Sequence, residues 1–306
     1  MRLVFAGTPD VALPSLEALH ASTHEIAAVV TRPPAASGRG RSVSPSAVAA
    51  CALELGIPVI TANPRQPEFV GLLRELQPEC CPVVAYGALL PTEVLAIPLR
   101  GWINLHFSLL PAWRGAAPVQ AAILHGDDVT GATTFLLDEG MDTGPTLGML
   151  TESVSPLDTA GELLQRLSVS GAELLVRTLD AWEHGGLDPR TQSADGVSYA
   201  PKIATDDARI DWATTALRVS RVVRACTPSP GAWTTFRTER LRLLPVATDR
   251  EVTLPPGIIA VERTRVLVGT ATQAIELGEV VPTGKRQMPA ADWARGVRIE
   301  SGESFV

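Results

Sequence analysis

The stretch Trp102-Ile103-Asn104-Leu105-His106-Phe107 predicts a β-strand whose two faces differ in chemistry. Side chains alternate between the faces of a strand, so the apolar side chains at positions 103, 105 and 107 share one face while Asn104 and His106 share the other. The segment Ser108–Pro118 follows at once and predicts a binding loop at the end of the strand. Asn and His on a strand can also be ordinary hydrogen-bonded core residues, but the adjoining loop favours a functional site.

The segments around this strand predict an α/β fold with a mostly parallel sheet. Short apolar runs such as Leu3–Phe5, Ile26–Val30 and Val83–Ala85 alternate with helical stretches such as Pro14–Leu19 and Ala47–Leu55. This alternation is typical of β-α-β units, in which helices cover both faces of a parallel sheet. Ligands bind such sheets at the C-terminal ends of the strands.

A candidate carboxylate follows the apolar run that ends at Leu137. Two glycines bracket Asp142 in Asp138-Glu139-Gly140-Met141-Asp142-Thr143-Gly144, and glycine permits a tight turn that presents a carboxylate. An ordinary acidic turn is the alternative for this segment alone. Combined with Asn104 and His106, Asp142 suits acyl transfer to an amine: hydrogen-bond donors stabilise the oxyanion, and the imidazole and carboxylate collect the proton.

Three further segments divide the chain. Residues 31–45 combine Pro, Gly, Ser and Arg without an apolar period, which predicts a long mobile loop. A helix is expected over Thr159–Trp182, and a polar connector follows it. We therefore expect a catalytic domain over residues 1–188, a linker over 189–205 and a second domain over 206–306.

The second domain has a different pattern, which predicts a small OB-like β-barrel. An amphipathic helix is expected over Ala213–Ala225. Strands are expected over Ala232–Phe236, Leu241–Val246, Ile258–Val261, Arg265–Val268 and Ala274–Val281. Five short strands in so few residues fit an OB-type barrel.

Composition and charge exclude several classes of protein. With 45% hydrophobic and 19% charged residues, the 306-residue chain can bury large cores, and disorder is not expected. No apolar stretch reaches the roughly 20 residues of a membrane span, and the first residues read as a strand rather than a signal peptide. A cytoplasmic protein is expected, with Cys51, Cys80, Cys81 and Cys226 reduced.

The net charge of −7 is unevenly distributed. Residues 1–204 hold 12 Lys and Arg against 21 Asp and Glu, whereas residues 205–306 hold 14 against 12. The C-terminal third is therefore the better candidate for contact with a polyanion, unless the difference arose by chance.

Three motifs resemble the signature of the 10-formyltetrahydrofolate-dependent formyltransferases. They are Asn104-Leu105-His106, Ser108-Leu109-Leu110-Pro111-Ala112-Trp113-Arg114-Gly115-Ala116-Ala117-Pro118 and Asp138–Gly144. Within that superfamily, the chain is most similar to the members that act on methionyl-tRNA. Phe5–Asp10, Gly38–Arg41, Val84–Gly87 and Pro282–Met288 also resemble those members.

The resemblance implies a Rossmann-like catalytic domain that holds the folate and an OB-like domain that contacts the tRNA. It implies that Asn104, His106 and Asp142 are catalytic. 10-Formyltetrahydrofolate would donate a formyl group to methionyl-initiator-tRNA for translation initiation. Folate is expected to contact Ser108, Leu109, Leu110, Pro111, Tyr86 and Gly87, and tRNA is expected to contact Arg39, Arg41, Lys285 and Arg286.

Several alternatives share part of this pattern. Formyltransferases that act on an amino-sugar nucleotide or on glycinamide ribonucleotide, and hydrolases that release formate, use the same trio. The amino-sugar enzymes are the hardest to exclude. A nicotinamide-dependent oxidoreductase is disfavoured because Gly7-Thr8-Pro9-Asp10 lacks the G-x-G-x-x-G pattern. An RNA-binding protein with an inactive domain is disfavoured because all three catalytic side chains are present.

The sequence also leads to expectations about metals and assembly. The five histidines show no clustered pattern of ligands, so no metal is expected. We also expect a monomer without membrane association.

Overall fold

The computed structural model describes residues 1–37 and 42–306, which form two compact units. The first unit comprises Met1–Pro118, Val129–Ser153 and Leu164–Tyr199. The second comprises Val119–Asp128, Val154–Leu163 and Ala200–Val306. Each unit buries its own apolar cluster.

The first unit is built on a seven-stranded sheet of order β10-β9-β7-β6-β1-β2-β5. Its strands are β1 (Arg2–Gly7), β2 (Glu25–Val30), β5 (Val59–Ile60), β6 (Cys81–Val84), β7 (Trp102–His106), β9 (Val129–Leu136) and β10 (Thr146–Ser153). The strands from β5 to β7 pair in parallel, whereas β9 runs antiparallel to both β7 and β10. In chain order the parallel strands lie 3-2-1-4-5, as in the Rossmann fold. The predicted mostly parallel sheet is confirmed.

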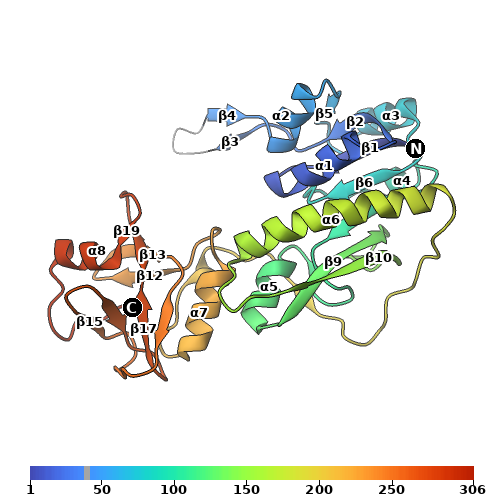
Figure 1. Cartoon of the computed structure of the whole chain (residues 1–306). Coiled ribbons are helices and arrows are strands. Elements are labelled where there is room, and N and C mark those ends of the chain that lie inside the picture. Colours follow the sequence, from blue (N-terminus) through green and yellow to red (C-terminus); the bar gives the residue numbers. More distant parts are fainter. Residues whose placement is uncertain (38–41) are drawn as a thin grey trace. The chain divides into compact units, whose positions relative to one another are not determined.

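Helices flank this sheet (Figure 1). They are α1 (Leu13–His20, preceded by the 3-10 turn η1, Asp10–Ala12), α2 (Ala47–Glu54), α3 (Pro67–Leu76), α4 (Thr92–Leu95) and α6 (Ala160–Glu183). The longest, α6, begins and ends within one residue of the predicted helix. Its side chains at Leu167, Leu175 and Leu179 are fully buried. Thr178 of α6 also hydrogen-bonds Thr134 of β9 through the two hydroxyls, at 2.9 Å.

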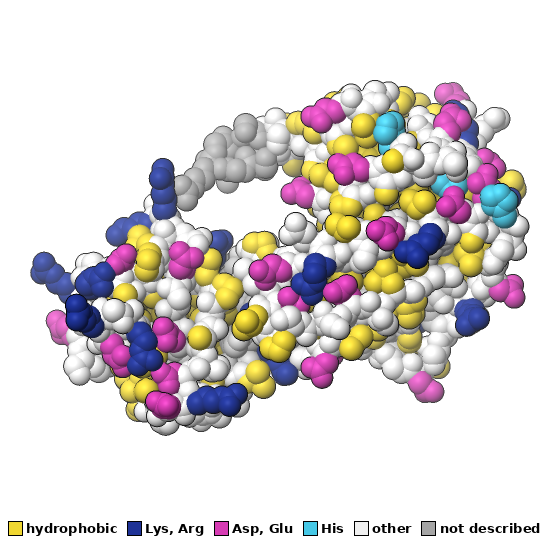
Figure 2. Space-filling view, viewed as in Figure 1, with side chains coloured by type: hydrophobic (Ala, Val, Ile, Leu, Met, Phe, Trp, Pro, Cys, Tyr) yellow, Lys and Arg dark blue, Asp and Glu magenta, His cyan; other side chains and the backbone are white. Residues whose placement is uncertain are grey.

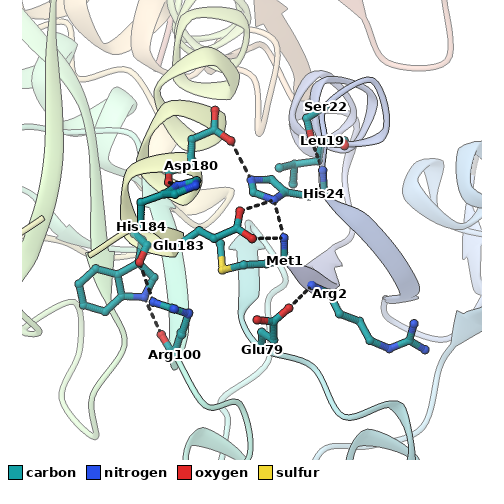
Figure 3. A network of polar contacts seen from close by, with 11 residues as sticks. Met1, Arg2, Leu19, Ser22, His24, Glu79, Arg100, Asp180, Glu183 and His184 are labelled. Atoms are coloured by element: carbon teal, nitrogen blue, oxygen red, sulfur yellow. Dashed lines mark hydrogen bonds and ion pairs between the residues drawn. The ribbon is translucent and has the colours of Figure 1, made fainter. Parts of the chain in front are cut away.

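The C-terminal end of α6 is tied to the start of the sheet by a polar network (Figure 3). The Met1 amino group lies 3.0 Å from a carboxylate oxygen of Glu183 and 3.0 Å from Nδ1 of His24. The other ring nitrogen of His24 lies 3.2 Å from Asp180. Burial lowers the pKa of His24, and the two carboxylates partly oppose that shift. The network therefore joins the C-terminal end of α6 to the residues directly before β1 and β2.

Two segments predicted to lack regular structure differ from that prediction. In the predicted loop over residues 31–45, β3 (Ala35–Ser37) and β4 (Ser42–Ser44) pair as an antiparallel ladder. Apolar periodicity could not reveal this ladder, because strands of three residues are too short to show an alternating pattern. The polar connector also carries a short strand, β11 (Tyr199–Ala200).

The second unit contains the predicted β-rich region. Its helices are α5 (Pro118–His125), α7 (Ala216–Ala225) and α8 (Ala290–Val297), with a 3-10 turn η2 (Asp206–Ala208). Eight strands of the described residues form two four-stranded sheets, β12-β13-β18-β19 and β14-β17-β16-β15. Their bounds are β12 (Trp233–Phe236), β13 (Glu239–Leu243), β14 (Ala247–Asp249), β15 (Ile259–Val261), β16 (Val266–Val268), β17 (Ala274–Leu277), β18 (Glu279–Pro282) and β19 (Met288–Pro289).

The prediction of five strands was wrong in number. The predicted strand Ala274–Val281 divides at Gly278 into β17 and β18, which belong to different sheets. One apolar run therefore supplies two strands. The predicted helix Ala213–Ala225 begins later, because the Thr215 hydroxyl caps α7 by accepting from the backbone N–H of Arg218 at 3.2 Å.

Aromatic rings form the centre of the second unit. Phe305 stacks on Trp212 and on Trp293, with ring centroids 5.5 and 5.8 Å apart. Phe236 meets Trp293 edge to face, with ring centroids 5.3 Å apart.

Among the helices of the described residues, none has the length and apolar character that a membrane span requires.

Burial along α6 leads to a stability prediction. Leu167→Ala should lower the free energy of unfolding by about 3 kcal/mol, because it leaves a cavity under a fully buried side chain. Val169→Ala is the control on the same helix, since Val169 is 54% exposed, and it should change stability by less than about 0.5 kcal/mol. Urea unfolding followed by circular dichroism measures both. Equal effects would contradict the assignment of the buried face.

Candidate active site

His106 lies at the C-terminal end of β7, and both of its ring nitrogens face polar atoms. Nε2 is 2.9 Å from the backbone carbonyl oxygen of Trp113, and Nδ1 is 3.7 Å from a carboxylate oxygen of Asp142. A carbonyl oxygen can only accept, so Nε2 carries a hydrogen and the nitrogen that titrates is Nδ1. The ring also meets Phe135 of β9 edge to face.

Burial determines the charge of this imidazole. The His106 side chain is 6% exposed, and burial lowers its pKa from the ordinary value. The negative charge of Asp142 and the hydrogen bond to Trp113 partly offset that shift. The ring is therefore neutral at neutral pH, and the neighbouring carboxylate stabilises the cation that forms when Nδ1 takes up a proton.

Asp142 is presented by a turn in which its own backbone is left-handed, with φ of 53°. The same carboxylate oxygen that faces His106 accepts a hydrogen bond of 2.7 Å from the backbone N–H of Gly115. Nearby, the Asp138 carboxylate accepts from the backbone N–H of Gly140 and from the Thr143 hydroxyl. The turn thus holds the carboxylate in place, while its side chain remains 16% exposed.

Asn104 lies two residues before His106 on the same face of β7. It is half-buried, and its carboxamide has no hydrogen-bond partner among the described residues. A free amide N–H beside a titratable imidazole is suited to bind a developing oxyanion. The structure therefore brings together His106 and Asp142, with Asn104 next to them on the strand.

The four residues predicted to contact folate after β7 differ in accessibility. Ser108 and Leu110 are buried, whereas Leu109 and Pro111 are partly exposed. The Ser108 hydroxyl donates to the carbonyl of Ala112 at 2.6 Å, so it closes the loop on itself. Its backbone carbonyl accepts from Thr133 of β9 at 2.7 Å. Side-chain surface for a ligand therefore comes from Leu109 and Pro111.

Tyr86 and Gly87, also predicted to contact folate, follow β6. The Tyr86 ring is buried in the core of the first unit, and its backbone carbonyl accepts from the Thr8 hydroxyl at 2.8 Å. Gly87 is exposed, has φ of 76°, and its carbonyl accepts from the guanidinium of Arg32 at 2.8 Å. The exposed backbone of Gly87 is thus the accessible part of this pair.

Basic side chains gather over the second unit (Figure 2). Lys285 and Arg286 are exposed in the turn between β18 and β19. Exposed basic residues near them in the sequence or on the same sheet are Arg237, Arg240, Arg242, Arg295 and Arg298. The guanidinium of Arg240 lies over the Trp233 ring, 3.6 Å from its centroid. Arg39 and Arg41 lie outside the described residues.

Sequence reasoning missed several residues that shape this site. Trp113 and Gly115 supply backbone contacts to His106 and Asp142, and they belong to the quoted loop without having been singled out. Gln192 and Ser198 of the connector contact the same loops. A polar segment with no periodicity offered no signal for them.

The arrangement can stabilise negative charge and exchange one proton, which suits attack of an amine on a carbonyl group. It contains a free carboxamide donor, a neutral imidazole and a carboxylate that favours the protonated imidazole. Over the described ranges 1–37 and 42–306, no group of three or more His, Cys, Asp or Glu side chains is placed to hold a metal ion.

Comparison with known proteins matches both units. The model of a family described as formyl transferase matches residues 1–179, and that of the formyl transferase C-terminal domain matches residues 202–298. The chain is 61% identical to a methionyl-tRNA formyltransferase of Thermobifida fusca, covering 100% of this chain and 99% of the relative. It is 59% identical to one of Streptomyces coelicolor, covering 99% of each.

A solved structure shares the fold at low identity. HypX from Aquifex aeolicus, in complex with tetrahydrofolic acid, superposes with a TM-score of 0.68 at 17% identity. The alignment covers 96% of this chain and 46% of HypX, so this chain spans about half the length of that protein.

The charge of Asp142 should be visible in the titration of His106. Asp142→Asn should lower the pKa of His106 further, because it removes the negative charge that raises it against the effect of burial. Histidine NMR signals recorded against pH measure this value. Glu139→Gln, in the same turn, is the control and should leave the pKa of His106 unchanged. A rise in the Asp142→Asn variant would contradict the geometry.

Proposed function

The chain belongs to the formyl transferase family, and we infer that it transfers the formyl group of 10-formyltetrahydrofolate to the α-amino group of methionyl-initiator-tRNA. The observation that carries this function is the identity of 61% and 59% to methionyl-tRNA formyltransferases over essentially the full length of both chains. The product, formylmethionyl-tRNA, serves translation initiation. An amino-sugar nucleotide is the weaker alternative acceptor, because the N-formyltransferase of Helicobacter canadensis in complex with dTDP-3-aminofucose is only 16% identical to this chain.

The donor is a folate, as the family implies. The partly exposed loop side chains Leu109 and Pro111 and the exposed backbone of Gly87 support a folate site at the C-terminal ends of β6 and β7. Ser108, Leu110 and Tyr86 would shape that site from beneath, because they are buried. This placement follows the general rule that open parallel sheets bind ligands beyond the C-terminal ends of their strands.

The reaction requires an oxyanion donor and a proton acceptor. The amine nitrogen bonds to the formyl carbon, and the Asn104 carboxamide donates to the oxygen that becomes negative. The proton lost by the amine passes to Nδ1 of His106, directly or through water. The bond from the formyl carbon to N10 of the folate then breaks, and N10 takes up that proton from His106, so tetrahydrofolate leaves and the ring is neutral again.

The low pKa of His106 fits this role in the proposal. A ring that is neutral at rest can accept the proton, and Asp142 stabilises the resulting imidazolium. Once protonated, His106 also adds positive charge beside the oxyanion. No covalent intermediate with the protein is required.

The tRNA contacts are proposed for the β-rich domain. Lys285 and Arg286 are exposed on the β18–β19 turn, where phosphates can approach them. Arg39 and Arg41 are proposed to contact the acceptor end of the tRNA from the predicted loop.

We retain the division into a catalytic domain (1–188), a linker (189–205) and a tRNA-contacting domain (206–306). We propose a cytoplasmic location, because the aminoacyl-tRNA substrate is used at the ribosome, and we retain the monomer expected from the sequence.

Formyl transfer tests the function and the catalytic strand together. The wild-type protein should transfer labelled formyl from 10-formyltetrahydrofolate to methionyl-tRNA and not to an amino-sugar nucleotide. His106→Ala should lower kcat by about 10²- to 10⁴-fold, because the proton acceptor is removed. His20→Ala, an exposed histidine on α1, is the control and should retain full activity. Transfer to the sugar alone would overturn the acceptor, and full activity of His106→Ala would overturn the catalytic role.

The exposed turn between β18 and β19, which carries Lys285 and Arg286, should affect tRNA binding and not the chemical step. A Lys285→Ala/Arg286→Ala variant should raise KM for methionyl-tRNA and leave kcat nearly unchanged. The slope of log binding constant against log salt should also shrink by about 0.9 for each lost phosphate contact. Arg250→Ala, an exposed arginine outside this turn, is the comparison. An unchanged salt slope would remove these two residues from the tRNA interface.

A further inference from the structure

Residues 190–199, which lie within the predicted linker 189–205, are hydrogen-bonded to the catalytic loops. Arg190 and Thr146 exchange two backbone hydrogen bonds of 2.8 and 2.9 Å. The Ser198 carbonyl accepts from the backbone N–H of Arg114 at 2.9 Å, and the Ser198 hydroxyl accepts from that of Trp113 at 2.9 Å. This segment therefore does more than join two domains.

Gln192 joins two catalytic loops through one carboxamide. Its Nε2 donates to the backbone carbonyls of Asp142 and Gly144, both at 2.8 Å. Its Oε1 accepts from Nε and Nη2 of Arg114, at 3.1 and 2.7 Å. A glutamine side chain offers two donor hydrogens and one carbonyl oxygen with two lone pairs, so all of its hydrogen-bonding capacity is used.

The two residues that face His106 both adopt unfavourable backbone conformations. Trp113, whose carbonyl accepts from Nε2 of His106, has φ of 59°, and Asp142 has φ of 53°. Non-glycine residues in this left-handed region are strained and persist only where surrounding contacts hold them. Here Ser198 bonds the backbone N–H of Trp113, and Gln192 bonds the backbone carbonyl of Asp142.

We propose that Gln192 is a positioning residue for formyl transfer: it holds Asp142 in the conformation that sets its carboxylate against Nδ1 of His106. The expected changes in kcat rest on the proposed function, because they are measured as formyl transfer. Gln192 acts through Asp142, because its whole carboxamide is already bonded to Arg114, Asp142 and Gly144. Ser198 performs the matching task for Trp113 on the other side of the imidazole.

The four hydrogen bonds of the Gln192 carboxamide determine which substitutions test its role. Gln192→Glu keeps the shape of the side chain and the oxygen that faces Arg114. It replaces Nε2 by an oxygen that repels the carbonyls of Asp142 and Gly144. The Asp142 turn should then relax and the carboxylate should move away from His106. Gln192→Met is the second variant, because it keeps the volume and removes all four bonds.

The expected result separates positioning from general stability. Both variants should lower kcat about 10- to 100-fold, with KM for methionyl-tRNA and for 10-formyltetrahydrofolate within about twofold of wild type. Thr191→Ala, an exposed neighbour, is the control and should behave as wild type. Asp142→Asn combined with Gln192→Glu should lose no more activity than Asp142→Asn alone, because both act through one carboxylate.

A second readout needs no activity. The pKa of His106 should fall in Gln192→Met, which adds no charge, towards its value in Asp142→Asn, as measured by NMR titration. Wild-type kcat in the variants, or losses that multiply in the double variant, would overturn the proposal. If wild type itself failed to formylate methionyl-tRNA, the proposed function would fall. An unchanged pKa of His106 in Gln192→Met would instead overturn the positioning role.

Discussion

A buried imidazole with both nitrogens engaged is the constraint on which this site depends. Nε2 of His106 donates to the carbonyl of Trp113, and Nδ1 faces Asp142 at 3.7 Å. Burial favours the neutral ring and lowers its pKa, whereas the carboxylate favours the charged ring and raises the pKa. Their opposition leaves a ring that is neutral at rest and can be protonated during a reaction. That balance requires the Trp113 carbonyl and the Asp142 carboxylate to stay where they are.

The sheet explains how such a ring is placed. β7 lies between parallel β6 and antiparallel β9, so His106 ends a strand that is supported on both sides. Phe135 of β9 contacts the ring, and Thr133 holds the following loop through the carbonyl of Ser108. The helix α6 packs with buried leucines and hydrogen-bonds β9. Packing of β9 and α6 thereby restrains the strand that carries the imidazole. The loops that contain Trp113 and Asp142 restrain the two ring nitrogens.

The β-rich second unit serves a different physical purpose. Its centre is aromatic, with Phe305 stacked on both Trp212 and Trp293, and this leaves its surface available for charge. Exposed arginines and Lys285 lie on the strands and turns around that centre, in a domain of positive balance within an acidic chain. An acidic catalytic unit with a basic companion suits a small-molecule donor combined with a polyanionic acceptor.

Sequence alone determined the parallel sheet, helix α6, the β-rich second domain and the family, because periodicity and local motifs are written in neighbouring residues. It also singled out Asn104, His106 and Asp142 as candidates. The strand count of the second domain, the β3–β4 ladder and the connector contacts came only from the tertiary structure. The titrating nitrogen of His106, the left-handed backbones of Trp113 and Asp142, and the bonds from Gln192 depend on folding as well. Gln192 and Asp142 lie 50 positions apart, and no local pattern encodes a hydrogen bond that forms only when distant loops meet.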